Sequence, residues 1–296
     1  MRGTLVRKAA ALGALAVGAV ACGDSAGPGA ASVTVLLTDA ASAYVESALV
    51  DIGAVELIGG AGGPIVLTDD GTDGPVDLME LQGLATTQLA AQDIEPGTYT
   101  QLRLVVESAS VVLADGVTFR DGTSEADLTV PSGAQTGIKL NLKPDDENGG
   151  GVDIAAGQTV LVVDFDVNQS YRLQGNPDME DGVTSVSFQP TLRALVDDVA
   201  GSISGTVTAD AGVALDVEGL VVSAAPVENT ALEPFESTTA TALVQADGTY
   251  TIYFMVPGEY DVSVEAGEGF TAPVVEAVTV GQSEDVEGVD FVIVAG

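Results

Sequence analysis

The chain has 296 residues, of which 44 are Asp or Glu, nine are Lys or Arg and none is His, so its formal net charge is −35. This acidity excludes nucleic acid as a partner and also excludes an anionic membrane surface bound through basic patches, because both need clustered Lys and Arg. Without His, and with a single Cys, the sequence also excludes Ser-His-Asp and Cys-His nucleophiles and His-ligated zinc.

The first 21 residues are typical of an export signal. Arg2, Arg7 and Lys8 precede an uncharged, apolar run over residues 9–21. As a helix this run would be only about 20 Å long, too short for the roughly 30 Å of bilayer hydrocarbon. Residues 1–21 are therefore predicted to be a signal peptide rather than a permanent span.

The cysteine, Cys22, directly follows this signal. With small residues at Ala19 and Ala21, the stretch resembles the lipobox of bacterial lipoproteins, in which the thiol receives lipid, although that pattern prefers Leu where Ala19 stands. The alternative is an ordinary cleavage site that releases a soluble protein. We expect residues 22–31 to form a lipidated flexible tether. Gly23, in place of the Asp that retains some lipoproteins at the inner membrane, favours the outer membrane.

From residue 32 onward, strand patterns with a period of two dominate the sequence. In the run over residues 161–167, Asp164 and Asp166 are expected on an exposed polar face, with Arg103 pairing with one of them. Residues 78–92 have a helix pattern, which Gly83 and two threonines weaken. The clearest alternating runs are 32–38, 98–107, 138–143 and 161–167.

The composition changes near residue 200. No Lys or Arg occurs after Arg193, and short strand patterns follow at regular spacing. This change predicts a domain boundary. The fold class expected is all-β, with two β-sandwich domains in tandem, over residues 32–196 and 201–296, after the signal peptide and tether.

The C-terminal part carries the runs G-S-I-S-G-T-V-T from Gly201, D-G-T-Y-T-I from Asp247 and V-P-G-E-Y-D-V-S-V-E-A from Val256. With these runs, residues 201–296 resemble the carboxypeptidase regulatory-like, or prealbumin-like, domains. The resemblance implies a seven-stranded sandwich that serves as an accessory, adhesive or spacing module, without catalytic residues.

The first part carries V-T-V-L-L-T-D-A from Val33, E-P-G-T-Y-T-Q-L-R-L from Glu95, L-V-V-D-F-D-V-N-Q-S from Leu161 and F-Q-P-T-L from Phe188. With these runs, residues 32–195 are similar to the bacterial lipoprotein domain of unknown function 4382. The resemblance implies an envelope lipoprotein with a β-sandwich domain, and it implies no activity.

The sequence contains two candidate sites, a carboxylate pair and an acidic loop. Asp164 and Asp166 form a carboxylate pair of the kind a glycosidase uses, but sugar enzymes use aromatic platforms and this chain has no Trp and 4% aromatic residues. Asp69, Asp70 and Asp73 lie in a glycine-flanked loop that could hold Ca²⁺, the alternative being a solvated turn. We therefore expect no catalytic residues and no cofactor, with Ca²⁺ as the one candidate.

Together these patterns predict a non-enzymatic, exported lipoprotein, anchored in the cell envelope through Cys22 and acting as a structural or binding module at the cell surface. The alternatives are a calcium- or carbohydrate-binding adhesin and, third, a carboxylate-based glycosidase. A protein or a glycan is the expected partner. A shallow largest pocket with few aromatic residues would argue against binding and hydrolysis of glycans.

Overall fold

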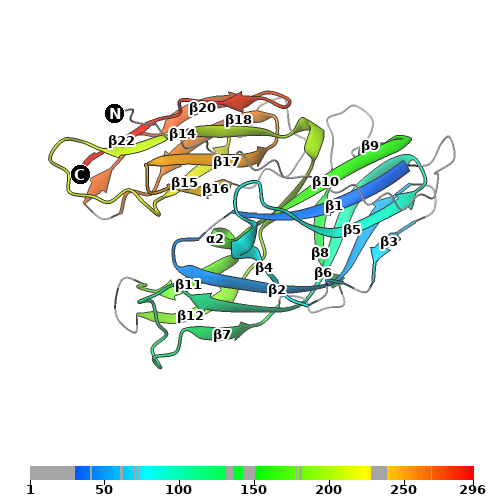
Figure 1. The fold of residues 1–296 in the computed structure, drawn as a ribbon, viewed down its shortest axis with the longest axis horizontal. Coiled ribbons are helices and arrows are strands. Elements are labelled where there is room, and N and C mark those ends of the chain that lie inside the picture. The colour runs from blue at the N-terminus through cyan, green and yellow to red at the C-terminus, as the bar shows by residue number, and fades with distance from the viewer. Residues whose placement is uncertain are drawn as a thin grey trace, which may run out of the picture.

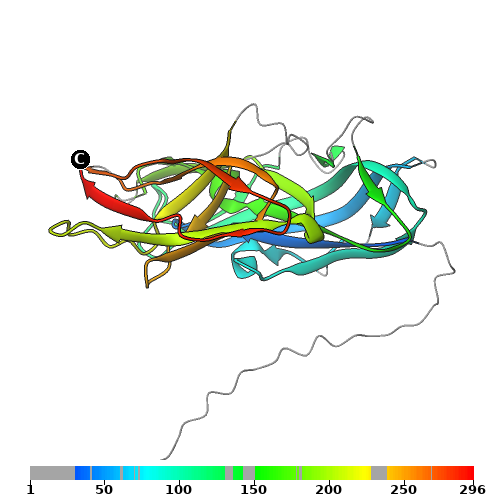
Figure 2. The same ribbon diagram turned by 90° about the horizontal axis from the view of Figure 1, so that it is seen from above.

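The computed structural model describes residues 31–296 except 41, 61–62, 70, 73, 131–135, 143–150, 178, 180–181, 228–238 and 268. In this part of the chain the fold is all-β, as predicted, with two β-sandwiches in tandem (Figure 1). Figure 2 shows that the strands of both sandwiches run mainly along the long axis of the molecule. The predicted signal peptide and nearly all of the predicted tether lie outside the described residues.

The first sandwich consists of two main sheets. One has the order β13-β10-β1-β5, in which β1 and β10 are parallel, and the other has the order β3-β2-β6-β7, with β4 beside β2 and with β8 and β9 beside β6. The strands are β1 (Ala31–Ala40), β2 (Val45–Gly59), β3 (Ile65–Thr68), β4 (Val76–Asp77), β5 (Thr87–Ile94), β6 (Gly97–Leu113), β7 (Glu125–Leu128), β8 (Ile138–Asn141), β9 (Val152–Ile154), β10 (Gly157–Asp166), β11 (Tyr171–Gly175), β12 (Val183–Phe188) and β13 (Leu192–Val196).

The two sheets share one apolar core. Val35 on β1, Leu104 on β6 and Phe165 on β10 belong to the same buried cluster, with side chains fully shielded from solvent. The alternating patterns predicted for residues 98–107 and 138–142 are confirmed, because their apolar members face this core while Lys139 is exposed. Lys143, the last residue of the second pattern, lies outside the described residues. The separate pair β11–β12 carries Tyr171 and Phe188, whose rings pack edge to face.

The second sandwich has the sheet orders β17-β14-β22-β19 and β16-β15-β18-β20. Its core holds Tyr250 and Tyr260, whose hydroxyls donate to the carbonyls of Val289 at 2.6 Å and Val256 at 2.7 Å. Burial raises the pKa of both phenols. The strands are β14 (Gly201–Ala209), β15 (Val221–Pro226), β16 (Ala240–Leu243), β17 (Thr249–Met255), β18 (Gly258–Val264), β19 (Phe270–Thr271), β20 (Val275–Val280), β21 (Asp285–Val286) and β22 (Phe291–Ala295).

The helix expected over residues 78–92 is wrong. The segment forms a short 3-10 turn, η1 (Leu78–Leu81), and then strand β5. Gly83 adopts a φ of 70°, a left-handed conformation that ends a helix, and the threonines that follow favour a strand. Two further helical turns are α2 (Val167–Ser170) and η2 (Asp197–Val199). Among the described residues, no helix has both the length and the apolar character needed to cross a membrane.

Candidate functional site

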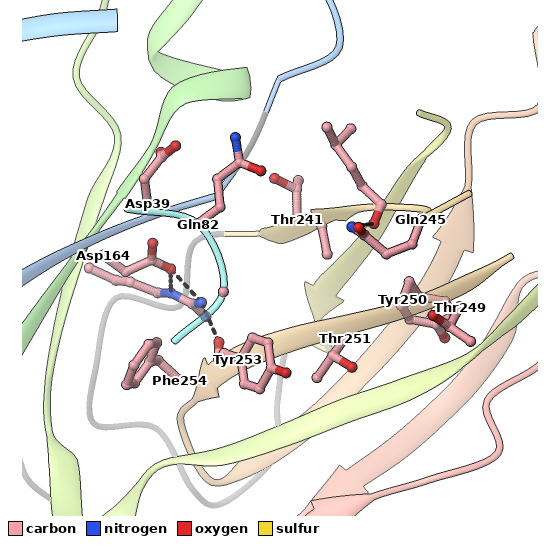
Figure 3. A pocket seen from close by; sticks show the side chains of 14 residues that line it. Asp39, Gln82, Asp164, Thr241, Gln245, Thr249, Tyr250, Thr251, Tyr253 and Phe254 are labelled. Atoms are coloured by element: carbon pink, nitrogen blue, oxygen red, sulfur yellow. Dashed lines mark hydrogen bonds and ion pairs between the residues drawn. The ribbon is translucent and has the colours of Figure 1, made fainter. Parts of the chain in front are cut away.

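A polar cleft of about 380 Å³ lies where the two sandwiches meet (Figure 3). The first sandwich lines it with residues at the ends of β1, η1, β10 and β13, among them Asp39, Gln82, Asp164 and Arg193. The second sandwich lines it with residues of β16 and β17 and with the loop that joins them. The cleft therefore depends on both sandwiches.

A buried ion pair lies where the two sandwiches are in contact. We call this contact around Arg193 the joint. Arg193 on β13 stands directly opposite Asp164 on β10, and both side chains are more than nine-tenths buried. Two guanidinium nitrogens, Nε and Nη2, lie 2.6 Å and 2.5 Å from Asp164 Oδ2. Arg193 also reaches the second sandwich, because its Nη2 donates to the Tyr253 carbonyl at 3.0 Å and its Nη1 lies 3.6 Å from the sulfur of Met255. One guanidinium thus links the two sandwiches.

The backbone of β17 is adapted to this contact. Phe254 has a φ of 53°, which is rare for a bulky residue, and it occupies a bulge where the pairing of β14 with β17 shifts register. The bulge lies between Tyr253, whose carbonyl accepts from Arg193, and Met255. Beside it Phe254 packs on an apolar contact between the sandwiches, formed by Val162, Leu195 and Val256. The local strain is therefore located at the joint.

Asp166 makes a second link across the joint. Its side chain caps α2 by accepting from the Gln169 amide N–H at 2.9 Å, and it accepts from the Thr241 hydroxyl of β16 at 3.3 Å. The Gln169 side-chain amide donates both to Asp166, at 2.8 Å, and to the Thr239 carbonyl, at 2.6 Å. Burial raises the pKa of Asp166 to about 6, and the nearby Asp164 carboxylate adds to this shift.

The first sandwich holds its wall of the cleft in place with buried polar contacts. The hydroxyl of Thr38 donates to the carbonyls of Leu81 and Ala85, each at 3.0 Å, which fixes the loop after η1. An isolated bridge pairs Asp39 with Gln82 in the same loop. Asp39 Oδ1 also accepts from the backbone N–H of Val167 at 3.1 Å. Strand β1 therefore holds the loop through two neighbouring residues and is itself tied to α2.

The second sandwich presents one face of β17 to the cleft. Thr249, Thr251 and Tyr253 alternate along this strand and line the cleft. Ile252 and Tyr250, between them, are buried in the core, although Tyr250 also contributes to the lining of the cleft. Figure 3 shows Thr251 and Tyr253 next to each other along this strand. A β-carbon added to Gly83 would lie 3.7 Å from the Tyr253 ring, so this ring spans the cleft to the opposite wall.

The sequence has a recognisable family. A family model described as "Domain of unknown function (DUF4382)" matches residues 30–180, slightly more than half of the chain. The chain belongs to the DUF4382 family. The match covers most of the first sandwich but ends before β13, so Arg193 lies beyond it. No curated protein matches the sequence.

Solved structures give only a distant likeness. The minor pilin GBS52 of Streptococcus agalactiae is 12% identical, with 90% of this chain and 96% of the pilin covered and a TM-score of 0.27. The shaft pilin SpaA of Lactobacillus rhamnosus GG is 11% identical, with 90% and 97% covered and a TM-score of 0.24. A cohesin–X–dockerin complex of Acetivibrio cellulolyticus is 16% identical, and only 32% of this chain and 58% of that chain are covered, with a TM-score of 0.24. TM-scores this low support no statement about function.

The prediction that Asp164 and Asp166 lie on an exposed polar face is wrong. Asp164 and Asp166 are 4% and 5% exposed, because the second sandwich covers the face of β10 that was expected to meet water. Arg103 does not pair with either of them. It pairs with Glu56 on the neighbouring strand β2 at 3.0 Å, and Asp164 pairs with Arg193 instead.

The other predicted site residues are not tested by the structure. Cys22, Asp70 and Asp73 lie outside the described residues, and Asp69 is exposed. Within the part of the chain that is described, no group of three or more carboxylate, His or Cys side chains is placed to hold a metal ion. The calcium site therefore stays a prediction.

Sequence reasoning missed Arg193, Thr251 and Tyr253. A signal for Arg193 was present, because it is the last cation of a very acidic chain and stands in the apolar run T-L-R-A-L-V. A buried cation in such a strand requires a carboxylate on a neighbouring strand. Thr251 and Tyr253 gave no such signal, since their exposure to a cleft depends on how the second sandwich packs on the first.

Proposed function

We propose that this DUF4382 protein is a non-enzymatic lipoprotein of the cell envelope, whose two sandwiches act as a structural or binding module at the cell surface. The observation that supports a non-enzymatic role is that Asp164 and Asp166 are both engaged in structural contacts. Asp164 is held by Arg193, and Asp166 is held by Gln169 and Thr241, so both serve the joint between the sandwiches. A general acid and a nucleophile need access to substrate, whereas Asp164 meets the cleft with only 4% of its surface exposed and is paired with Arg193, and Asp166 is 5% exposed.

Anchoring through lipid on Cys22 fits the position of the first strand. Strand β1 begins at Ala31, and residues 23–30 separate it from Cys22. Even fully extended, these residues would reach only about 30 Å. Lipid on Cys22 would therefore hold the first sandwich close to the membrane, with the second as an accessory, prealbumin-like module. We propose the outer membrane as the membrane concerned.

The strand pairings and the apolar cores support two domains. Among the described residues, every strand pairing joins strands from the same side of residue 200, and each side has its own apolar core. We propose that residues 32–196 and 201–296 are the two domains, connected by the joint around Arg193.

Lipid attachment is tested by mass spectrometry of the mature N-terminus and by partition between detergent and aqueous phases. We expect a mass that corresponds to a cleaved, acylated Cys22 and recovery in the detergent phase. The variant Cys22→Ala is expected to move to the aqueous phase or to remain unprocessed. An unmodified thiol in a protein that stays wholly in the aqueous phase would overturn the proposed location.

A binding role is the second candidate, because the cleft is not poor in aromatic side chains. Tyr253 and Phe254, in a chain with seven Phe, six Tyr and no Trp, both line it. These two rings favour a carbohydrate over calcium as the ligand of the cleft. A larger cavity, of about 460 Å³, is lined by residues of β9, β10 and η2 and has no aromatic side chain on its wall, so the criterion set for the largest pocket argues against glycan binding there.

A further inference from the structure

We propose that the cleft between the sandwiches binds a neutral saccharide, recognised by Gln82 on one wall and by Thr251 and Tyr253 on the other. This inference rests on the proposed role as a binding module and adds the place and the ligand class. The cleft volume, about 380 Å³, lies at the lower end of the range of roughly 300–1,000 Å³ typical of small-molecule sites. Such a space suits a ligand of one or two sugar rings.

The hydrogen-bonding groups that remain available in the cleft are neutral. Within the described part of the chain, no partner occupies the hydroxyls of Thr251 and Tyr253 or the side-chain amide of Gln82. Hydroxyls and amides both donate and accept, as sugar hydroxyls do. A polyhydroxylated ligand could therefore satisfy all three groups.

The charges of the cleft argue against an anionic ligand. Asp164 and Arg193 neutralise each other, which leaves Asp39 as the remaining charged side chain among the residues that line the described cleft. The chain as a whole carries a net charge of −35. An acidic sugar or a phosphate would meet repulsion from both sources.

Aromatic side chains supply the apolar part of the wall. The rings of Tyr253 and Phe254 lie 6.5 Å apart and are tilted by 54°, so they present differently oriented faces at the joint (Figure 3). The C–H edges of a sugar ring pack on such faces, because the π-cloud is electron-rich. Both residues are half-buried, so ligand binding would remove further apolar surface from water.

The joint holds these groups in place before a ligand arrives. Arg193 binds the Tyr253 carbonyl, and Thr38 fixes the loop that carries Gln82. The walls thus come from two sandwiches but are tied together by buried bonds, which lowers the entropy lost on binding.

The test uses the mature chain, purified from membranes in a detergent without sugar headgroups, with isothermal titration and saturation-transfer NMR. The neutral probes are maltose, cellobiose and N,N′-diacetylchitobiose, the anionic probe is glucuronic acid and the cationic probe is spermidine. We expect at least one neutral disaccharide to bind with a Kd of about 1 mM or lower, the weak end of specific binding.

Matched variants locate the site. Thr251→Val and Tyr253→Phe each remove one hydroxyl and are expected to weaken binding about three- to tenfold. Thr279→Val, on the exposed face of β20, and Tyr44→Phe remove the same groups outside the cleft and are expected to leave affinity unchanged. Unchanged far-ultraviolet circular dichroism of each variant shows that it has folded.

The proposal is overturned if no neutral probe binds at about 10 mM, well above the weakest Kd expected. It is also overturned if only spermidine or glucuronic acid binds, or if both cleft variants bind as the unaltered chain does. The mass of the N-terminus, read on the same preparation, reports on the lipid anchor separately, so failure of the cleft and failure of the proposed location are distinguishable.

Discussion

Arg193 shows how one residue can determine the way two sandwiches are joined. Its guanidinium and the Asp164 carboxylate are both withdrawn from water, so neither charge is tolerable without the other. A buried pair of this kind adds little stability compared with apolar residues of the same shape. Loss of one partner is a different matter, since the remaining charge then lies buried without compensation.

We therefore expect Arg193→Met to lower the free energy of unfolding by about 3–5 kcal/mol, measured by urea denaturation. The matched control is Arg103→Met, because Arg103 and Glu56 form a pair that is partly exposed to solvent. That variant is expected to lose less than about 1 kcal/mol. Equal losses in the two variants would show that the joint does not isolate Asp164 from water.

Asp166 gives the joint a dependence on pH. Its pKa is about 6 in the folded chain against 3.8 for the ordinary carboxyl group, so the folded state holds the proton more tightly than the unfolded state. Its contribution to stability is therefore greatest below pH 4 and is lost as the pH rises through 6, when the buried group must ionise. The loss is on the order of 3 kcal/mol.

The variant Asp166→Asn isolates this effect from the other carboxylates. The difference in unfolding free energy, variant minus unaltered chain, is expected to rise by about 3 kcal/mol between pH 3.5 and 7.5. Asp121→Asn serves as a control of opposite sign, because a hydrogen bond from Thr123 lowers the pKa of the exposed Asp121. A difference for Asp166→Asn that stays flat with pH would show that its carboxyl is solvated.

At the scale of elements, the sequence predicted the strands better than it predicted which faces of the strands are covered by other parts of the molecule. Alternation is a local property, and it correctly identified which residues of β6 and β8 face the core. It failed for β10, where the polar residues of the alternating pattern are buried because a second sandwich covers them. The cleft could not be predicted for the same reason, since it exists only where the two sandwiches meet.

The left-handed residue Ala277 offers a test of strain at the level of a single strand. Ala277 has a φ of 56° at a bulge in β20, where its N–H donates to Asp261 at 3.0 Å and its side chain is exposed. Glycine adopts this conformation without steric cost. Ala277→Gly is therefore expected to raise the free energy of unfolding by about 1 kcal/mol.

The control for this variant is Ala91→Gly, at an exposed position of β5 with an ordinary backbone conformation. Glycine there is expected to cost about 0.5–1 kcal/mol, because it only adds freedom to the unfolded chain. Urea denaturation of both variants gives the comparison. Destabilisation of the same size in both would mean that the left-handed conformation of Ala277 is not present in solution.

The whole molecule combines uncharged apolar cores with a strongly charged surface. The two apolar clusters contain no charged side chain, whereas 44 carboxylates are spread over a chain with nine cations. The surface therefore repels itself, and this repulsion opposes compact folding at low ionic strength. Added salt screens it, since the Debye length falls from about 30 Å at 0.01 M to about 3 Å at 1 M.

The dependence of stability on different salts separates screening from calcium binding. If acidic loops such as the one around Asp69 are solvated turns, the denaturation midpoint rises with ionic strength, and CaCl₂ and MgCl₂ at equal concentration raise it by the same amount. If the loop holds Ca²⁺, the stabilisation grows with calcium concentration as the logarithm of site occupancy and exceeds that of Mg²⁺. We expect equal effects of the two ions, because a glycine-flanked acidic turn of this kind is ordinarily solvated. An excess for Ca²⁺ that disappears in the variant carrying Asp69→Asn, Asp70→Asn and Asp73→Asn would instead assign the loop as a calcium site.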